Sequence, residues 1–389
     1  MRNKELNYII SHFNEDQKNI YISNVKAGIN GTYIDFLNHN NINYDVTDLT
    51  TAVKSIHILT KENKRIGTIE NPIYPNNNNY GISIMKDKFK TENHLKKYGI
   101  NTTSSKIYTY GELEVAKQEF FKENPDRRAV IKPLSGSLSR GVYVNVSRDR
   151  FEENWNYSLE ERKNNKSAKA IVQEHLEGFE ARATILQGRL ISIVARVPAY
   201  VSGDGHHTIK ELIGMKNRER KKCKYLRKHL IKINNKHNEF LLNNSRSITD
   251  IPADGEKILL SSISNIINGG EIFNITDYVS ENIKEFALDT LAVFPGMYSG
   301  GLDIMLKSFD DPKPHVLEVN HFPVITLAKY PTYGKPCEPE KVLIESLISQ
   351  YQFSYETGFP YEIEDSHDYI RHFIDFSKRQ VKMNDYIDI

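Results

Sequence analysis

The stretch Leu317-Glu318-Val319-Asn320 places two oxygen-bearing side chains within an apolar run. Glu318 and Asn320 lie two positions apart, so on a strand they point to the same face. Gly300-Gly301-Leu302-Asp303-Ile304 indicates a neighbouring strand, joined to the first through a polar turn around residues 310–312. Asp303 could therefore join the other two in a Mg²⁺ site, because a buried carboxylate is costly unless it is paired or bound to a metal. The alternative is a set of polar residues at strand ends, and this stretch alone does not decide between them.

Length and composition indicate a soluble globular protein of two or three domains. The chain has 389 residues, of which 39% are hydrophobic and 26% charged. We find neither an apolar run long enough to span a membrane nor the apolar core of a signal peptide. Two cysteines, Cys223 and Cys337, make a disulfide framework untenable, and we expect a cytoplasmic protein. The net charge of +2 gives no reason to expect a membrane or nucleic-acid partner.

The chain divides into three predicted parts, an N-terminal α/β domain over 1–84, a central domain over 85–350, and a tail over 351–389. For the first part we predict strands at 19–22, 42–46 and 55–59 and a helix over 28–37. No Gly-x-Gly-x-x-Gly follows its first strand, so the fingerprint of dinucleotide-binding folds is absent. We expect this part to serve packing or a homodimer contact.

A second informative segment is a loop of small and hydroxyl residues between strands predicted at 129–132 and 142–146. Gly136 and Gly141 permit close backbone approach, and free N–H groups in such a turn can hold an anion. Lys132 closes the first strand and could reach a phosphate. The loop joins two strands and has the wrong spacing for a P-loop. Phosphate binding is favoured over an ordinary hairpin, which would need no lysine at its base.

Further motifs follow in order. We predict a helix over 86–98, and strands before and after a turn that Glu174 and Glu180 bracket. A Gly-Asp-Gly turn at 203–205 leads into a helix with Thr208 at its N-cap and Glu211 three residues later, the spacing of a capping box.

Together these motifs resemble the ATP-grasp superfamily of carboxylate–amine ligases. Ile131-Lys132-Pro133, the Gly/Ser loop, the segment 173–182, Gly301-Leu302-Asp303 and Leu317-Glu318-Val319-Asn320 occur in the expected order. The segments 196–209 and 264–277 are similar to the ATP-grasp regions of cyanophycin synthetase and bifunctional glutathione synthase. The resemblance covers about residues 85 to 347. It implies an α/β ATP-grasp fold that binds nucleotide between two antiparallel sheets, with a lid at about 105–185 and a helical insertion at about 208–245.

The resemblance also implies roles for individual residues. ATP would be bound by Lys88, Lys132, Ser135, Gly136, Ser137, Ser139, Gly141, Glu174, Leu176 and Glu180. Mg²⁺, with Mn²⁺ as a substitute, would be bound by Asp303, Glu318 and Asn320. Arg196 would lie near the transferred phosphate or the acyl substrate, and Asn265, Gly269 and Gly270 on the acceptor side. Lys132, Arg196 and Asn320 would then be the catalytic residues.

The implied reaction joins amino acids or short peptides through an acylphosphate. Ser261 and Ser262 occupy a region where such ligases usually carry an arginine, which departs from the glutathione and cyanophycin types. The chain most resembles a stand-alone L-amino-acid ligase. The alternatives are a ligase that modifies a protein, peptide or polymer terminus and an ATP-binding module without ligase activity, and the intact Lys132, Asp303, Glu318 and Asn320 argue against the latter.

A strongly basic stretch at 216–228 has helical spacing. We expect a solvated helix face with Leu226, Leu230 and Ile233 on its apolar side, rather than a site for a polyanion. No aromatic residues alternate with the charges, which argues against nucleic acid. Neither His206-His207 nor Cys337 has the neighbours that a metal or nucleophilic site requires. Helices are predicted at 339–350 and 367–378.

Overall fold

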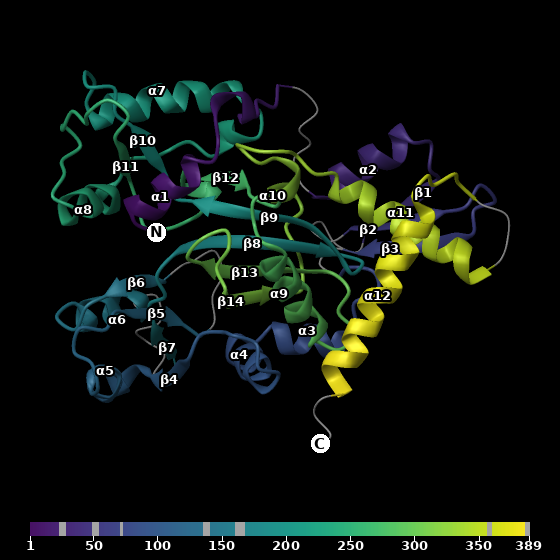
Figure 1. Cartoon of the computed structure of the whole chain (residues 1–389), viewed down its shortest axis with the longest axis horizontal. Coiled ribbons are helices and arrows are strands. Elements are labelled where there is room, and N and C mark those ends of the chain that lie inside the picture. The colour runs from purple at the N-terminus through teal and green to yellow at the C-terminus, as the bar shows by residue number, and fades with distance from the viewer. Residues whose placement is uncertain are drawn as a thin grey trace.

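The computed structural model describes residues 1–22, 29–48, 54–70, 73–134, 141–159, 168–355 and 360–385. Its described strands form four sheets. In Figure 1 the five-stranded sheet crosses the middle of the molecule, and the four-stranded sheet lies below it. A lobe of helices that includes the two-stranded sheet lies above the five-stranded sheet, and the three-stranded sheet lies at the right beside the C-terminal helices. The elements that position the candidate site are the central sheet and the sheet below it.

The central sheet has the strand order β12-β9-β8-β13-β14, and every neighbouring pair is antiparallel. The strands β8 and β9 are buried along most of their length. The predicted pairing of the strands that contain Asp303 and Glu318 is confirmed. The bounds are β8 (Phe179–Leu186), β9 (Arg189–Val197), β12 (Glu271–Asn274), β13 (Gly300–Leu306) and β14 (His315–Asn320), with α9 (Glu281–Ala292) packed on the sheet.

The lower sheet, which we call the lid, has the order β4-β7-β5-β6. Two helices cover it, and Phe121, Phe151 and Trp155 fill the space between helices and strands. The predicted strands on both sides of the Gly/Ser loop are confirmed. The bounds are β4 (Ser105–Thr109), β5 (Ala129–Pro133), β6 (Tyr143–Val146), β7 (Lys169–Glu174), η2 (Tyr110–Glu112), α5 (Leu113–Phe121) and α6 (Phe151–Leu159).

The N-terminal part differs from the prediction at two places. Residues 19–22 form no strand; instead Asn19 N–H donates to Thr332 O and Tyr21 Oη to Pro331 O, so this segment lies along a central-domain loop. The third strand of the N-terminal sheet was not predicted, because Arg65-Ile66-Gly67-Thr68-Ile69-Glu70 has a central glycine and charged ends. The sheet order is β1-β2-β3, with β1 (Tyr44–Asp48), β2 (Lys54–Leu59), β3 (Arg65–Glu70), and the predicted helix α2 (Ile29–His39) beside it.

The helix predicted over 86–98 is present as α4 (Lys88–Lys97), and a further helix that was not predicted, α3 (Asn79–Met85), precedes it. They separate at Asp87, whose carboxylate accepts from Phe89 N–H (2.9 Å) and Lys90 N–H (3.0 Å) as the N-cap of α4. A local side-chain cap therefore sets the start of α4, two residues later than predicted. At the other end of α4, Gly99 has φ +70°, which explains why the helix ends there as predicted.

The upper lobe contains the predicted capping box, with Thr208 and Glu211 bonded to each other's backbone at the start of α7 (Ile209–Lys222). The expectation that its basic stretch is one solvated face is wrong. Lys216 and Arg220 are turned inward, where the buried carboxylate of Glu271 lies 3.0 Å and 3.6 Å from their nitrogens. The other elements of this lobe are β10 (Tyr200–Ser202), which precedes α7, and then η4 (Leu226–Lys228), α8 (Asn235–Asn243), β11 (Lys257–Leu259) and η5 (Ile266–Asn268).

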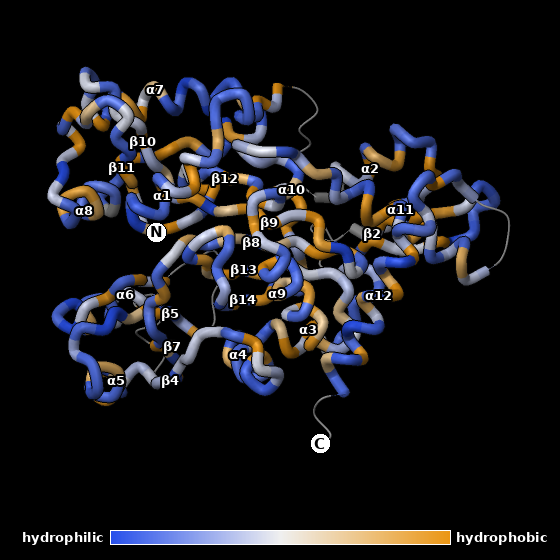
Figure 2. The backbone as a smooth tube through the Cα atoms, in the orientation of Figure 1, coloured by the Kyte–Doolittle hydropathy of each residue, from blue (hydrophilic) through white to orange (hydrophobic). Residues whose placement is uncertain are grey.

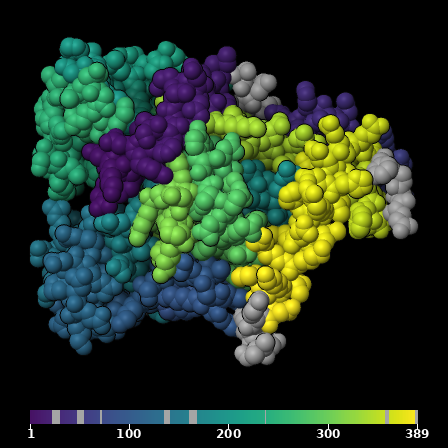
Figure 3. Space-filling view, viewed as in Figure 1, coloured from purple at the N-terminus to yellow at the C-terminus, as the bar shows by residue number. Residues whose placement is uncertain are grey.

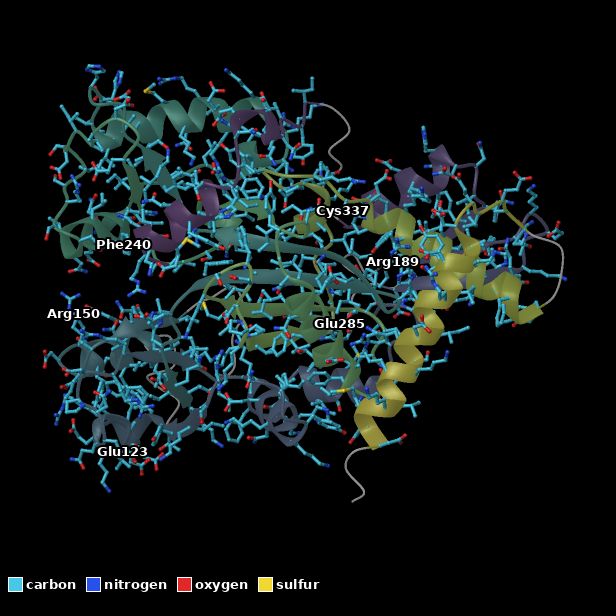
Figure 4. The ribbon with its side chains drawn as sticks, viewed as in Figure 1. Glu123, Arg150, Arg189, Phe240, Glu285 and Cys337 are labelled. Carbon is cyan, nitrogen blue, oxygen red and sulfur yellow. The ribbon has the colours of Figure 1, made fainter. Side chains whose placement is uncertain are left out.

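Both predicted C-terminal helices are present and longer than predicted. They are α11 (Pro339–Tyr355), which packs on the N-terminal sheet, and α12 (Ser366–Asp385). Arg189 of β9 bonds to Asp368 of α12 at 2.9 Å, and Arg379 lies 2.5 Å from Glu285 of α9 (Figure 4). The short elements α1 (Asn3–Ile10), η1 (Glu15–Gln17) and α10 (Thr326–Lys329) complete the described chain. None of its helices combines the length and apolar composition that crossing a membrane requires.

Candidate active site

Two lysines and a glutamate from three separate elements line one narrow pocket. Lys88 is at the start of α4, Lys132 lies on β5 of the lid, and Glu318 lies on β14 of the central sheet. Lys88 Nζ is 3.9 Å from Glu318 Oε1. Burial, and then the charge of Lys88, lower the pKa of Lys132 to about 8. The fold thus brings together two cations predicted to bind phosphate and one predicted metal ligand.

Glu92 belongs to the same pocket, and the sequence analysis did not single it out. Its buried carboxylate accepts from Lys96 Nζ (2.7 Å), Thr103 Oγ1 (2.7 Å) and Ser105 N–H (2.7 Å). These contacts join α4, which carries Lys88, to the first strand of the lid. Glu92 therefore links the two walls of the pocket. In the sequence, its only signal is the i,i+4 spacing to Lys96.

A buried ionic array crosses the centre of the sheet next to this pocket. Arg182 and Asp303 are opposite each other on β8 and β13, and Arg182 donates from Nε at 2.6 Å and from Nη2 at 2.8 Å. Arg196 forms an ion pair with Glu180, its partner across β8 and β9, and its Nη2 is 3.4 Å from Asp303 Oδ1. Although burial alone would raise the pKa of Asp303, the two guanidiniums hold it below its usual value.

Arg182 is the second residue that the sequence analysis missed. Its signal was the spacing of two from Glu180, which puts both side chains on the same face of β8. Gly301 on the adjacent strand leaves space for the guanidinium, since a Cβ there would lie 3.0 Å from Arg182 Nη1. Arg182 and Arg196 together neutralise carboxylates that would otherwise repel the phosphates of a nucleotide.

The predicted Mg²⁺ ligands meet at one edge of this array. Asp303 is the cross-strand partner of Glu318, and Asn320 that of Gly301. Glu318 has a side chain that is 40% exposed, and Asn320 Nδ2 is buried with no hydrogen-bond partner in the described part of the chain. These oxygen-bearing side chains fit the chemistry of Mg²⁺. Both oxygens of Asp303 already accept from Arg182, so Asp303 has only its remaining lone pairs to offer. Within the described ranges no three His, Cys, Asp or Glu side chains group around a metal-sized site.

Three of the residues predicted to bind ATP lie on β7, on β8 and in the turn that connects them. Glu174 ends β7 and is bonded to Arg127 Nη2 at 3.2 Å, Leu176 is half-buried in the connecting turn, and Glu180 faces Arg196. The lid-loop residues Ser135, Gly136, Ser137 and Ser139 lie outside the described residues. Gly141 has φ +71°, and a Cβ there would lie 2.6 Å from Ser158 O, so the chain needs glycine at this position for packing.

The predicted acceptor turn precedes β12. Asn265 accepts from Ile267 N–H at 3.0 Å, and Gly269 ends the short helix η5 with φ +89°. Gly270 has no room for a side chain, because a Cβ would lie 2.7 Å from Val197 O and 2.8 Å from Asn265 O. The next strand residues pair with Val197 and Arg196, so the turn lies one strand away from the ionic array.

Two curated proteins are similar in sequence to about two thirds of the chain. The chain is 28% identical over 277 residues to the glutathione biosynthesis bifunctional protein GshAB of Clostridium perfringens, covering 68% of this chain and 34% of that protein. It is 28% identical over 267 residues to cyanophycin synthetase of Synechocystis, covering 66% of this chain and 29% of the relative. These ligases are homologues of the chain. No known family model matches it.

The fold is that of the ATP-grasp ligases. The crystal structure of a bifunctional glutathione synthetase from Pasteurella multocida superposes with a TM-score of 0.59 at 23% identity, covering 82% of this chain and 43% of that chain. The predicted α/β ATP-grasp architecture is confirmed. The chain spans about a third of the length of the curated relatives it matches.

Proposed function

We propose that the chain is an ATP-dependent carboxylate–amine ligase. The observation that carries the proposal is the convergence of Lys88, Lys132 and Glu318 in one pocket, beside the array of Arg182, Arg196 and Asp303. These residues come from α4, the lid and the central sheet. A site that binds a polyphosphate between two sheets needs such contributions from both sides. Homology to named ligases supports the same activity.

The reaction activates a substrate carboxylate, which is a poor electrophile on its own. A substrate carboxylate oxygen attacks the γ-phosphorus of ATP, and ADP leaves with the electrons of the broken P–O bond. The resulting acylphosphate is a mixed anhydride. An amine then attacks its acyl carbon, inorganic phosphate leaves, and the nitrogen loses a proton to give the amide. The protein needs to position the reactants and stabilise charge rather than to supply a nucleophile.

The residues of the pocket suit these tasks. Lys88 and Lys132 would bind the phosphates, and Arg196 would hold the transferred phosphoryl group or the acyl substrate. Glu318 and Asn320, with the remaining lone pairs of Asp303, would hold Mg²⁺, which neutralises charge on the phosphates when it is bound. Glu174 and Leu176 would contact adenine and Glu180 the ribose, with Asn265, Gly269 and Gly270 on the acceptor side. The lid would exclude water from the acylphosphate.

Amino acids or short peptides are the proposed substrates. A second candidate is a ligase that modifies the terminus of a protein, peptide or polymer. The exposed cations that follow Arg220 favour this second candidate. We further propose a division into 1–84, 85–350 and 351–389.

The test is ADP and phosphate release by the purified chain with ATP and Mg²⁺ across a matrix of amino acids, short peptides and acidic peptides. We expect release that depends on the acceptor, and the acylphosphate should be trapped by hydroxylamine as a hydroxamate. Glu318→Gln serves as the inactive control. If no member of the matrix stimulates ADP release and no hydroxamate forms, the ligase proposal is wrong.

A further inference from the structure

The outward side of α7 and the turn after it carry concentrated positive charge. The exposed cations between positions 218 and 232, which we call the basic face, are Arg218, Lys221, Lys222, Lys224, Arg227, Lys228 and Lys232. One exposed carboxylate, Glu219, lies among them and is bonded to Lys222 at 2.7 Å. The whole chain has a net charge of only +2, so the charge is strongly localised. Figure 2 shows α7 as a largely hydrophilic segment at the top of the molecule.

The inward side of the same helix fixes the basic face to the acceptor turn. Lys216 Nζ lies 3.0 Å from Glu271 Oε1 and 3.4 Å from the centre of the Tyr200 ring. Arg220 donates to Gly270 O at 3.2 Å and to His229 O at 2.7 Å. Because Gly270 and Glu271 connect the predicted acceptor turn to β12, these contacts attach α7, which carries part of the basic face, to this turn.

Exposed apolar side chains accompany the cations. Ile267, in the acceptor turn, is 51% exposed, and Ile20 and Ile22 are also exposed. Lys224 N–H donates to Tyr21 O at 2.7 Å, which places the two isoleucines beside the basic face. The surface therefore combines positive charge with aliphatic contacts, and its apolar part extends to the acceptor turn.

We propose that the basic face binds an acidic stretch of the polypeptide that serves as the amine acceptor. This inference rests on the proposed ligase function and names the class of acceptor. Carboxylate side chains complement the cations, while aliphatic residues of the same polypeptide would contact the isoleucines. Binding there would hold the acceptor next to the turn and raise its local concentration at the site.

A polypeptide fits this surface better than a nucleic acid. Single-stranded nucleic acids are bound on exposed aromatic rings between cations. Tyr225, the aromatic residue within the basic stretch, is packed against Tyr330 with ring centres 4.9 Å apart, and Tyr330 is also in contact with Tyr21. Its ring is therefore engaged within the protein.

The binding test uses fluorescein-labelled poly-L-glutamate and fluorescence anisotropy at two salt concentrations. The test variant is Lys221→Glu/Lys224→Glu/Lys228→Glu. The matched control reverses three exposed cations of the N-terminal sheet, Lys61→Glu/Lys64→Glu/Arg65→Glu. We expect the test variant to bind at least about tenfold more weakly and the control to bind like the wild type, with affinity falling as salt rises. Equal binding by all three proteins, or no binding by the wild type, would overturn the proposal. Preferential binding of polyuridylate would assign the surface to nucleic acid instead.

Turnover separates this inference from the ligase proposal. With an acidic peptide as acceptor, the test variant should lose kcat/KM about tenfold while the KM for ATP and the yield of hydroxamate stay unchanged. An equal loss with a neutral peptide would contradict the acidic-acceptor inference and leave the ligase intact. Failure of hydroxamate formation in the wild type would instead contradict the ligase, and polyglutamate binding would still be measurable.

Discussion

Arg182 and Asp303 form a bidentate ion pair across two neighbouring strands of the central sheet, with N–O distances of 2.6 Å and 2.8 Å. Both side chains are buried. The pair therefore lies where the pocket of Lys88, Lys132 and Glu318 meets the predicted metal ligands. Glu318 is the cross-strand partner of Asp303, so any displacement of Asp303 would be transmitted directly to the pocket.

Removing one partner of this pair should be costly. Among the described residues, Arg182→Met leaves the buried carboxylate of Asp303 with the 3.4 Å ion-pair contact to Arg196, and we expect the free energy of unfolding to fall by about 3–5 kcal/mol. Denaturant unfolding measures this. The control is Glu177→Gln, which removes an exposed ion pair with Arg2 and should cost less than about 1 kcal/mol.

The double variant Arg182→Met/Asp303→Leu distinguishes support of the fold from support of the site. Replacing both charges with apolar groups should restore much of the stability, because no unpaired charge then remains buried. Activity should not return, since the site has lost Asp303. A double variant as unstable as Arg182→Met would show that the pair is not the source of the loss.

Glu318→Gln should abolish turnover with little effect on stability. The side chain is partly exposed and its nearest cation, Lys88, is 3.9 Å away, so neutralising it costs the fold less than about 1 kcal/mol. ADP release and thermal unfolding measured on the same preparation test this. A fully active variant would remove Glu318 from the set of metal ligands.

Nucleotide binding should take up protons near pH 8. Burial and the neighbouring Lys88 lower the pKa of Lys132 from 10.5 to about 8, so part of the free protein has a neutral lysine at that pH. A polyphosphate beside Nζ favours the ammonium form and raises the pKa again. Calorimetric titration with ATP in two buffers of different ionisation enthalpy gives the proton uptake.

Two variants make this measurement specific. Lys132→Met should eliminate the uptake, and Lys106→Met, at an exposed lysine of the same lid, should leave it unchanged. The lowered pKa of Lys132 also makes the free energy of unfolding depend on pH. The folded state binds fewer protons than the unfolded chain between pH 8 and 10.5, so the contribution of Lys132 to the free energy of unfolding rises across that interval. Undiminished uptake in Lys132→Met would assign the proton to another group.

Local alternation and ordered motifs marked β5, β8, β13 and β14 individually, but they did not mark β12, for which no strand was predicted. They also could not reveal the partner of each charge. The bidentate pairing of Arg182 with Asp303 joins residues 121 positions apart, and no local rule connects them. Similarly, the sequence of α4 shows Glu92 only as one charge on a polar helix. Its partners Thr103 and Ser105 lie outside that helix, at the start of the lid.

The basic helix α7 shows a further limit of local pattern, because the sequence indicated exposure for two cations that the structure buries. Its charge run predicted a uniformly solvated face, yet Lys216 and Arg220 are inward, since helical periodicity places them one turn apart on a single side. Glu271, on a strand distant in sequence, compensates both buried charges, and Arg220 also donates to the backbone oxygens of Gly270 and His229. In Figure 3 the upper lobe, which contains α7, lies above the lid on the left of the molecule. Arg150 Nη2 donates to Asn243 Oδ1 at 3.2 Å between the two.

The acceptor turn offers a test that leaves the nucleotide pocket intact. In Gly270→Ala the new Cβ would lie 2.7 Å from Val197 O and 2.8 Å from Asn265 O, so the backbone of the turn must shift away from β9. Gly111→Ala is the matched control, because nothing lies within 4 Å of a Cβ at that position. We expect kcat/KM for the amine acceptor to fall at least about tenfold in Gly270→Ala, with the KM for ATP and hydroxamate formation nearly unchanged, whereas Gly111→Ala should behave like the wild type. Steady-state kinetics with each substrate varied in turn measure the difference. A loss of ATP affinity equal to the loss for the acceptor would show that the turn does not belong to the acceptor side.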